Sequence, residues 1–205
     1  MKKQPSGKFV VFEGLDGSGQ STQVALLADF LKSKGYNVLV TKEPTRESPA
    51  AQEIRLALEE KQNLSPRKLQ ELFVEDRRWH LEKIVCPFLQ ESDKNIVISD
   101  RYFFSTLAFG SSDSLDEEWL AEINKDFLLP DILFFMDTKP ETAIKRIEQR
   151  GEAKQLFERL EKLTVVYQNY QRVLKRFENK ITVVYLHGER SIKEIFDEIK
   201  SKINI

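Results

Sequence analysis

The sequence has few of the residues and patterns that mark secreted, zinc-binding or membrane-spanning proteins. It contains one cysteine, Cys86, and two histidines. One cysteine cannot form an internal disulfide, and this set is too small for a structural zinc site. No apolar run approaches the roughly 20 residues of a membrane-spanning helix, and no signal-peptide-like apolar region precedes the first predicted strand. We therefore expect a cytoplasmic protein without a membrane partner.

The chain also lacks an excess of either charge. Its 32 Lys and Arg residues nearly balance its 33 Asp and Glu residues, for a net charge of −1. Such a balance does not favour a surface for nucleic acid or anionic membranes. The length of 205 residues suits one α/β domain with an ample core. We expect a single domain over residues 1–205 that acts as an enzyme or as a binding protein.

The most informative stretch is KFVVFEGLDGSGQST, residues 8–22. An apolar run predicts a buried strand, a glycine-rich turn follows, and a helical pattern begins near Gln20. Such a turn aims backbone N–H groups and the positive end of a helix at one anion. Gly14, Gly19 and Ser21 match the phosphate-loop pattern G-x-x-x-x-G-K-[ST]. The alternative is a turn that serves tight packing only. We predict a nucleotide-phosphate site formed by Gly14, Leu15, Asp16, Gly17, Ser18, Gly19, Gln20, Ser21 and Thr22.

One position departs from that pattern, because Gln20 stands where the loop lysine is expected. A glutamine amide can donate hydrogen bonds to phosphate oxygens but carries no charge. The site therefore lacks its strongest expected electrostatic contact. We predict a slow enzyme whose turnover rises in the Gln20→Lys variant.

Four more apolar runs predict strands, at about 37–41, 95–99, 132–136 and 181–186. Helical patterns separate them, the first ending near Gly35 and another running from Ser65 to about Pro87. Alternating strands and helices predict a three-layer α/β/α sandwich around a five-stranded parallel sheet, of the phosphate-loop NTPase type.

Charged residues follow the second and third predicted strands, at the sheet edge where ligands bind in open α/β folds. Arg46 lies in the loop after the second strand, although a solvated loop charge is the alternative. Asp100 and Arg101 end the third strand. An acid at this place can hold Mg²⁺ or its waters, and an arginine can bind phosphate bidentately. An Asp–Arg ion pair that caps the next helix is the alternative.

Two further stretches are candidates for ligand contacts. Phe73 and Arg77 are four residues apart on one predicted helix, so their side chains can meet the same planar ligand. A core aromatic is the alternative. Around Gly151, the charged segment at about 146–160 fits a mobile lid whose arginines close over phosphates. A solvated helical face is its alternative.

With these motifs in order, the chain resembles the thymidylate kinase family over nearly its whole length. The resemblance rests on FEGLDGSG from Phe12, EPTR from Glu43, LFVEDR from Leu72, DRYFFSTLAF from Asp100 and PDILFFMD from Pro130. It implies phosphorylation of dTMP to dTDP by ATP with Mg²⁺, and a homodimer packed through helices.

The resemblance also implies roles for individual residues. Phe73 would stack on thymine, Arg77 and Thr106 would contact the base, and Phe109 would pack under the deoxyribose. Arg46 and Arg101 would hold the dTMP phosphate, with Arg55 a weaker candidate. Arg146 and the loop 187–190 would enclose adenine. The remaining implied residues are Glu43 and Ser105 toward dTMP; Asp16, Ser21 and Asp100 toward the metal; and Asp16, Arg101 and Arg150 in catalysis.

Two alternatives to a dTMP kinase stay open. Gln20 favours a catalytically silent nucleotide-binding protein on the same fold. A kinase for another pyrimidine nucleotide is the second alternative, because a fold does not determine a substrate.

Overall fold

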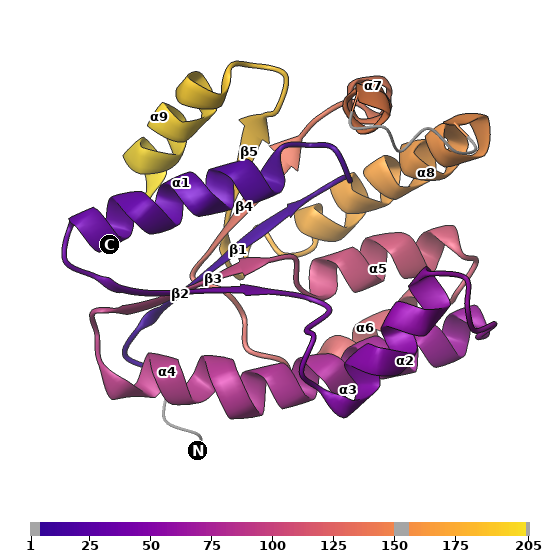
Figure 1. The fold of residues 1–205 in the computed structure, drawn as a ribbon, viewed down its shortest axis with the longest axis horizontal. Helices are drawn as coiled ribbons and strands as arrows, with labels where there is room; N and C mark the ends of the chain where they lie inside the picture. The colour runs from indigo at the N-terminus through magenta and orange to yellow at the C-terminus, as the bar shows by residue number, and fades with distance from the viewer. Residues whose placement is uncertain (1–4, 150–155, 204–205) are drawn as a thin grey trace.

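The structure is a computed structural model that describes residues 5–149 and 156–203. Its centre is a five-stranded sheet with the strand order β2-β3-β1-β4-β5 (Figure 1). All neighbouring strands are parallel. The strands are β1 (Lys8–Gly14), β2 (Asn37–Lys42), β3 (Asn95–Asp100), β4 (Ile132–Asp137) and β5 (Thr182–His187). Each of the five predicted strands is therefore confirmed, with its ends within a few residues.

The helices follow the expected alternation with the strands. They are α1 (Gln20–Ser33), α2 (Pro49–Leu58), α3 (Pro66–His80), α4 (Cys86–Glu91), α5 (Phe103–Ser112), α6 (Glu117–Asn124), α7 (Pro140–Gln149), α8 (Leu156–Lys175) and α9 (Ile192–Lys202). Ser48, Ser65 and Ser191 cap three of these helices, because each side chain accepts a backbone N–H from the first turn, and the cap at Ser65 agrees with the predicted start of that helix. Gly35, with a φ of 86°, follows the end of α1.

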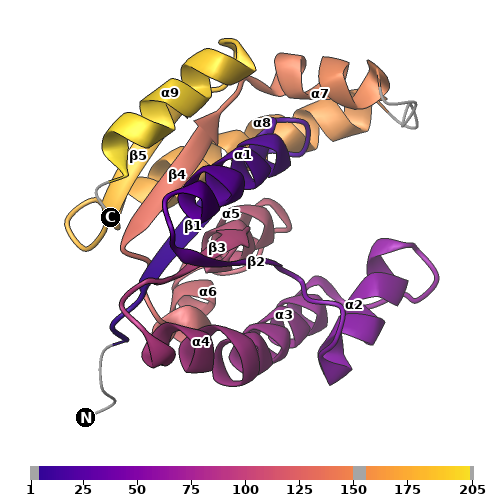
Figure 2. The ribbon, with the colours of Figure 1, turned by 60° about the vertical axis from the view of Figure 1, so that its left-hand side comes forward.

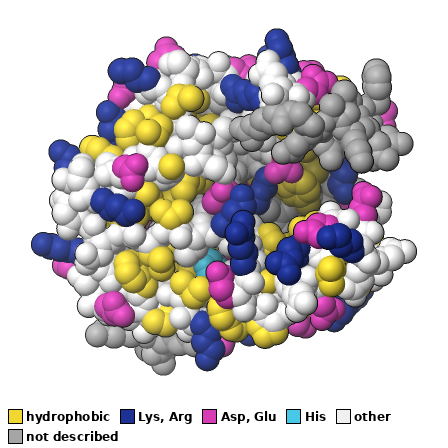
Figure 3. All heavy atoms as spheres, viewed as in Figure 1, with side chains coloured by type: hydrophobic (Ala, Val, Ile, Leu, Met, Phe, Trp, Pro, Cys, Tyr) yellow, Lys and Arg dark blue, Asp and Glu magenta, His cyan; other side chains and the backbone are white. Residues whose placement is uncertain are grey.

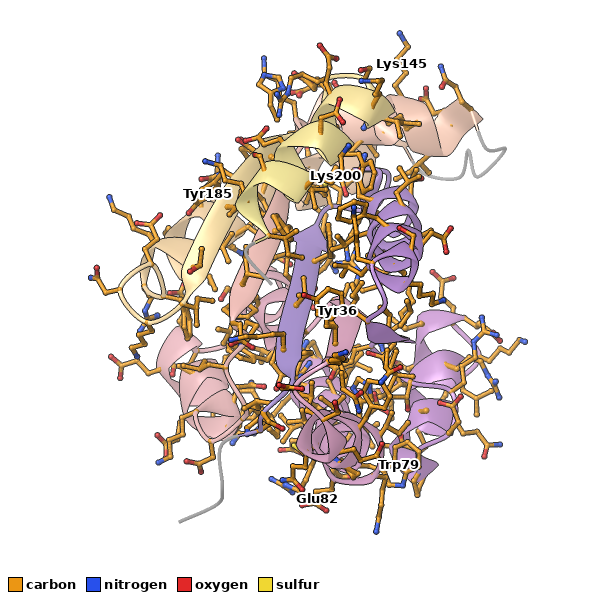
Figure 4. The ribbon with its side chains drawn as sticks, turned by 90° about the vertical axis from the view of Figure 1, so that its left-hand side faces the viewer. Tyr36, Trp79, Glu82, Lys145, Tyr185 and Lys200 are labelled. Atoms are coloured by element: carbon orange, nitrogen blue, oxygen red, sulfur yellow. The ribbon has the colours of Figure 1, made fainter. Side chains whose placement is uncertain are left out.

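Two apolar layers sandwich the sheet, because alternate strand residues point to opposite faces. Val10 and Phe12 pack on one face under α1 and α9. Phe9 and Val11 pack on the other face, where α5 and α8 form the largest helix pair. Figure 2 shows these helices on opposite sides of the strands, and Figure 4 shows side chains filling the space between the layers. The predicted three-layer α/β/α sandwich is thus confirmed.

The helix that starts at Pro66 differs from its prediction, because it does not end near Pro87. A π-helical turn, Leu81–Val85, joins α3 to α4, and the helical path continues to Glu91. Pro87 lies in the first turn of α4, where its missing N–H and its ring are tolerated after the wider π turn. Glu82, on this turn, is exposed and points away from the sheet (Figure 4).

The carboxyl ends of three parallel strands determine where the residues of the predicted phosphate site meet. The β1–β3 register pairs Phe12 with Asp100, and the β2–β3 register pairs Lys42 with Asp100. The carboxyl ends of β1, β2 and β3 therefore lie side by side beside the start of α1. Among the described residues, no helix is both long and apolar enough to span a membrane.

Candidate active site

The glycine-rich turn joins β1 to α1 as the sequence predicts. Gly17 and Gly19 have positive φ values of 81° and 94°, which favour glycine. A Cβ on Gly17 would also lie 2.4 Å from the carbonyl oxygen of Ala143. Residues 15–22 line an open cleft of about 230 Å³ together with Lys42, Asp100, Arg101 and Ile147, which we call the loop cleft. The N-terminus of α1 therefore faces a cleft that has room for a phosphate group.

Gln20 does not extend freely into the loop cleft. Its side chain is buried, and its amide donates to the Phe12 carbonyl oxygen at 3.0 Å and to Asp100 Oδ1. Ser21 Oγ donates to the other carboxylate oxygen, Asp100 Oδ2, at 2.8 Å. Gln20 thus occupies the position of the loop lysine, and its uncharged side chain links the ends of β1 and β3 by hydrogen bonds.

Arg101 is held in a strained backbone conformation at the centre of the site. Its φ of 77° is uncommon for a residue with a side chain. Its N–H donates to the Phe12 carbonyl oxygen at 2.9 Å. Its guanidinium donates to Asp16 Oδ1 at 2.7 Å and to Ser105 Oγ at 3.0 Å. Burial alone would lower the pKa of Arg101, but the surrounding negative groups, Asp16 foremost, raise it overall. Arg101 is therefore a fixed cation.

Sequence reasoning missed a buried acid behind this arginine. Glu13, the penultimate residue of β1, is fully buried and accepts the backbone N–H of Tyr102 at 2.8 Å. Its other oxygen accepts the hydroxyls of Ser105 at 2.6 Å and Tyr170 at 2.9 Å. Burial raises the pKa of Glu13 to about 7, although Arg101 and these hydrogen bonds oppose the shift. An acid within an apolar strand next to the glycine turn is the signal that could have revealed it.

We expect the raised pKa of Glu13 to make folding stability depend on pH. The folded state holds this proton up to about pH 7, whereas an unfolded glutamate loses it near its ordinary pKa of 4.5. The stabilisation is therefore complete below the unfolded pKa and is lost as the pH rises through the folded pKa. Relative to Glu13→Gln, the parent should lose up to about 3 kcal/mol of unfolding free energy between those values. Urea unfolding of both proteins across this pH range measures it, and a pH-independent difference would contradict it.

Arg146 connects the glycine turn to the loop after β5. Its guanidinium donates to the Ser18 carbonyl oxygen at 3.1 Å and to the Gly188 carbonyl oxygen at 2.9 Å. The same segment packs tightly, since a Cβ on Gly188 would lie 1.9 Å from Thr138 Oγ1. Arg146 and residues 187–190, which we predicted to enclose adenine, therefore lie together beside the phosphate loop.

A second, more apolar cleft of about 280 Å³ adjoins the loop cleft. We call it the helix cleft, because α3 and α5 supply many of the residues that line it. The predicted residues that line it are Asp16, Glu43, Phe73, Arg77, Arg101, Ser105, Thr106 and Phe109. Asp16 and Arg101 line both clefts. Figure 3 shows Lys and Arg side chains gathered beside the hollow on this face.

Arg77 forms the buried floor of the helix cleft. Its Nε donates to Glu43 Oε2 at 2.8 Å, and its two Nη atoms donate to Asn124 Oδ1 at 2.8 Å and Thr106 Oγ1 at 3.0 Å. Glu43 also contacts His80 Nδ1 at 2.9 Å. His80 therefore lies in a buried network with Glu43 and Arg77.

The loop after β2 is fixed to α3 by another buried acid. Asp76 accepts the backbone N–H of Thr45 at 2.8 Å and the hydroxyls of Thr45 and Ser48. Asp76 is 1% exposed, so its role is to hold this loop. Glu43 at the start of the loop is thereby positioned over Arg77.

Three predicted arginines of the described chain, Arg46, Arg55 and Arg146, are not among the residues that line the two clefts. Arg46 is exposed and lines a neighbouring hollow with Lys42 and Asp100. Arg55 is exposed on α2. Arg150 and most of the predicted lid, residues 150–155 with the side chains of 156–159, lie outside the described residues.

The donor set at the loop cleft fits magnesium rather than a protein-enclosed metal. Among the described residues, no cluster of three His, Cys, Asp or Glu side chains could hold a metal ion. Mg²⁺ needs no such cluster, because it keeps several waters and binds one or two carboxylates together with substrate phosphates. The Ser21 hydroxyl beside the Asp100 carboxylate, with Asp16 nearby on the cleft wall, meets that requirement.

Known proteins that are similar to this chain in sequence share one description. The sequence model of the family described as thymidylate kinase matches residues 12–199. A protein named probable thymidylate kinase from Pyrococcus horikoshii is 36% identical over 198 residues, which cover 94% of each chain. A second, from Sulfolobus acidocaldarius, is 37% identical over 192 residues, 92% of each chain. A third, from Methanococcus aeolicus, is 35% identical and covers 96% of this chain and 95% of its own. The chain therefore belongs to the thymidylate kinase family.

Proposed function

We propose that this protein phosphorylates dTMP to dTDP, with ATP as the phosphoryl donor and Mg²⁺ as the metal. The observation that carries the proposal is the position of Arg101 and Asp16 on the walls of both clefts. A nucleotide triphosphate on the glycine turn and a monophosphate in the helix cleft would place their phosphates against the same guanidinium. Phosphoryl transfer requires this kind of placement more than a covalent protein group.

The helix cleft suits a pyrimidine deoxynucleotide. Phe73 gives it an aromatic plane, and Arg77 and Thr106 give it hydrogen-bonding groups at the floor. The Phe109 ring lies 5.5 Å from the Arg101 guanidinium, so sugar and phosphate would lie next to each other there. We assign dTMP to this cleft, with Glu43 and Ser105 positioning Arg77 and Arg101.

The chemistry is charge neutralisation around the transferred phosphoryl group. Arg101 would bind the dTMP phosphate and the developing charge, and Asp16 would orient Arg101 and the metal waters. Ser21 and Asp100 would hold Mg²⁺, which would offset the negative charge of the phosphates. Arg150 is proposed as the lid arginine on the family resemblance. We also propose a single domain over 1–205 with a lid at about 146–160, a homodimer and a cytoplasmic location, all from the resemblance.

A second candidate is a catalytically silent nucleotide-binding protein, which the neutral Gln20 favours. A coupled assay of ADP release with ATP, Mg²⁺ and dTMP separates the two. We expect dTMP-dependent turnover, with dUMP, dCMP and the 2′-hydroxyl analogue of dTMP used less well. Binding of ATP and dTMP without turnover would instead support the silent protein. Preference for another pyrimidine nucleotide would correct the substrate.

Replacing Gln20 with lysine should raise turnover. A lysine adds a charge-assisted contact to the phosphates where the amide adds a neutral one, and we expect a gain of roughly tenfold in kcat. The same ADP-release assay measures it, with Ala25→Lys at an exposed position of α1 as a check on added charge. A Gln20→Lys enzyme no faster than the parent would refute the prediction.

A further inference from the structure

We propose that Lys42 supplies the phosphate-binding cation that the glycine turn lacks at Gln20. This inference deepens the proposed function, because it takes the loop cleft to be the triphosphate site. Lys42 is the last residue of β2, and among the residues that the structure describes it is one of two basic residues that line the loop cleft, the other being Arg101.

The first support is that Lys42 and Gln20 meet at one carboxylate. Lys42 Nζ lies 3.2 Å from Asp100 Oδ2, and the Gln20 amide donates to Asp100 Oδ1. The register of β2 against β3 pairs Lys42 with Asp100, so neighbouring strand ends place the ammonium. A cation is therefore present beside the position from which the loop lysine is missing, and it reaches that position from another strand.

The second support is that the ammonium is free to move toward a ligand. The Lys42 side chain is 61% exposed, whereas the Asp100 side chain is 9% exposed. The Lys42 ammonium is thus solvated already, and its stem has four rotatable bonds through which it can turn toward a ligand. A triphosphate carries more negative charge than one carboxylate, so it would compete well for this ammonium.

The other cations near the loop cleft are held by partners of their own, so they do not fill the role of the missing loop lysine. Arg101 is tied to Asp16 and Ser105 on the side of the helix cleft. Arg146 donates to carbonyl oxygens of residues 18 and 188. Lys42 is held only by the ion pair with Asp100 in the described part of the chain. Of these three side chains, it can leave its partner with the smallest structural cost.

The test measures binding of ATP and of ADP by calorimetry in the presence of EDTA, so that only the protein's own cations meet the phosphates. The variants are Lys42→Met and Lys42→Arg. Lys8→Met is the matched control, because Lys8 is also a strand lysine, 3.1 Å from Asp131 Oδ1, and lies at the opposite end of the sheet. We expect Lys42→Met to weaken ATP binding roughly tenfold and ADP binding less, since a loop-type lysine reaches the β- and γ-phosphates. Lys8→Met should stay near the parent, and Lys42→Arg, which keeps the charge, should bind ATP more tightly than Lys42→Met does.

Two results would overturn the inference. If Lys42→Met binds ATP as tightly as Lys8→Met does, Lys42 makes no contact with the ATP phosphates. If Lys42→Met loses affinity for ATP and ADP equally, Lys42 is a counter-ion of Asp100 and not a ligand of the terminal phosphate.

A turnover cycle adds an independent readout. If Lys42 replaces the loop lysine, Gln20→Lys should raise kcat more in Lys42→Met than in the parent, because the two cations serve the same charge. Equal gains in both backgrounds would count against the inference. Binding of ATP without dTMP-dependent turnover in the parent would contradict the proposed function. The ATP and ADP affinities would still show whether Lys42 binds the phosphates.

Discussion

Replacing Arg101 with alanine should lower kcat/KM for dTMP by roughly a thousandfold, the scale of removing a charged group that acts on a phosphoryl transition state. Arg101 is the cation shared by both clefts, and Asp16, Ser105 and Tyr170 hold its fork in one orientation. Its pKa is raised, so its charge is present at every working pH. Steady-state kinetics with dTMP and ATP varied in turn measure the loss.

The controls separate charge from folding. Arg101→Lys keeps the charge but loses the bidentate fork, and we expect it to fall between parent and Arg101→Ala. Arg78→Ala removes an exposed arginine of α3 and should keep parental kinetics. Because Arg101→Ala leaves Glu13 without its nearby cation, thermal unfolding should accompany the kinetics. A folded Arg101→Ala enzyme within tenfold of the parent would show that Arg101 does not neutralise the transferred phosphoryl group.

Replacing Arg77 with alanine should destabilise the fold by about 3–5 kcal/mol, the cost of breaking a buried ion pair by removing one partner. The Arg77 and Glu43 side chains are 2% and 4% exposed. Among the described side chains, the alanine leaves Glu43 with only its contact to His80 Nδ1, and it leaves a cavity where the guanidinium met Asn124 and Thr106. Urea unfolding measures the difference.

An exposed pair provides the comparison for Arg77. Lys193 pairs with Asp197 one turn apart on α9 and its side chain is 85% exposed, so Lys193→Ala should leave the free energy of unfolding close to that of the parent. The double variant Glu43→Gln with Arg77→Met should lose less than the sum of its single variants, because neither change then leaves a buried charge unpaired. A loss near that of Lys193→Ala in the Arg77→Ala protein would mean that water enters and solvates Glu43.

Local patterns were enough for much of this fold. The runs that became β1, β3 and β4 are apolar and almost wholly buried and alternate with helices, as expected in the middle of a parallel sheet with two covered faces. The glycine turn was equally readable, since its chemistry depends on consecutive residues. The helix after Ser65 was misjudged at its end, because a π turn before Pro87 satisfies the backbone in a way that residue preferences do not reveal.

The candidate site was readable only in part. Phe73 and Arg77 share a cleft as their helical spacing predicts, but that spacing could not tell that Arg77 would be buried against Glu43. Arg46 was predicted to bind phosphate because it follows a strand at the ligand-binding edge of the sheet. In the structure it lines a neighbouring hollow instead of either cleft. The direction of a loop side chain depends on how the loop is fixed, here by Asp76 on α3.

The sequence by itself determined the phosphate loop, the parallel sheet and the missing charge at Gln20, because each depends on residues adjacent in the chain or on a simple repeat. Tertiary structure alone decided that Glu13 supports Arg101 through Ser105 and Tyr170, which lie 92 and 157 residues away. It likewise placed Lys42 against Asp100, 58 residues away. Contacts of this kind follow from strand register and helix packing, so the sequence can supply the residues of the site but not the partner that each one meets.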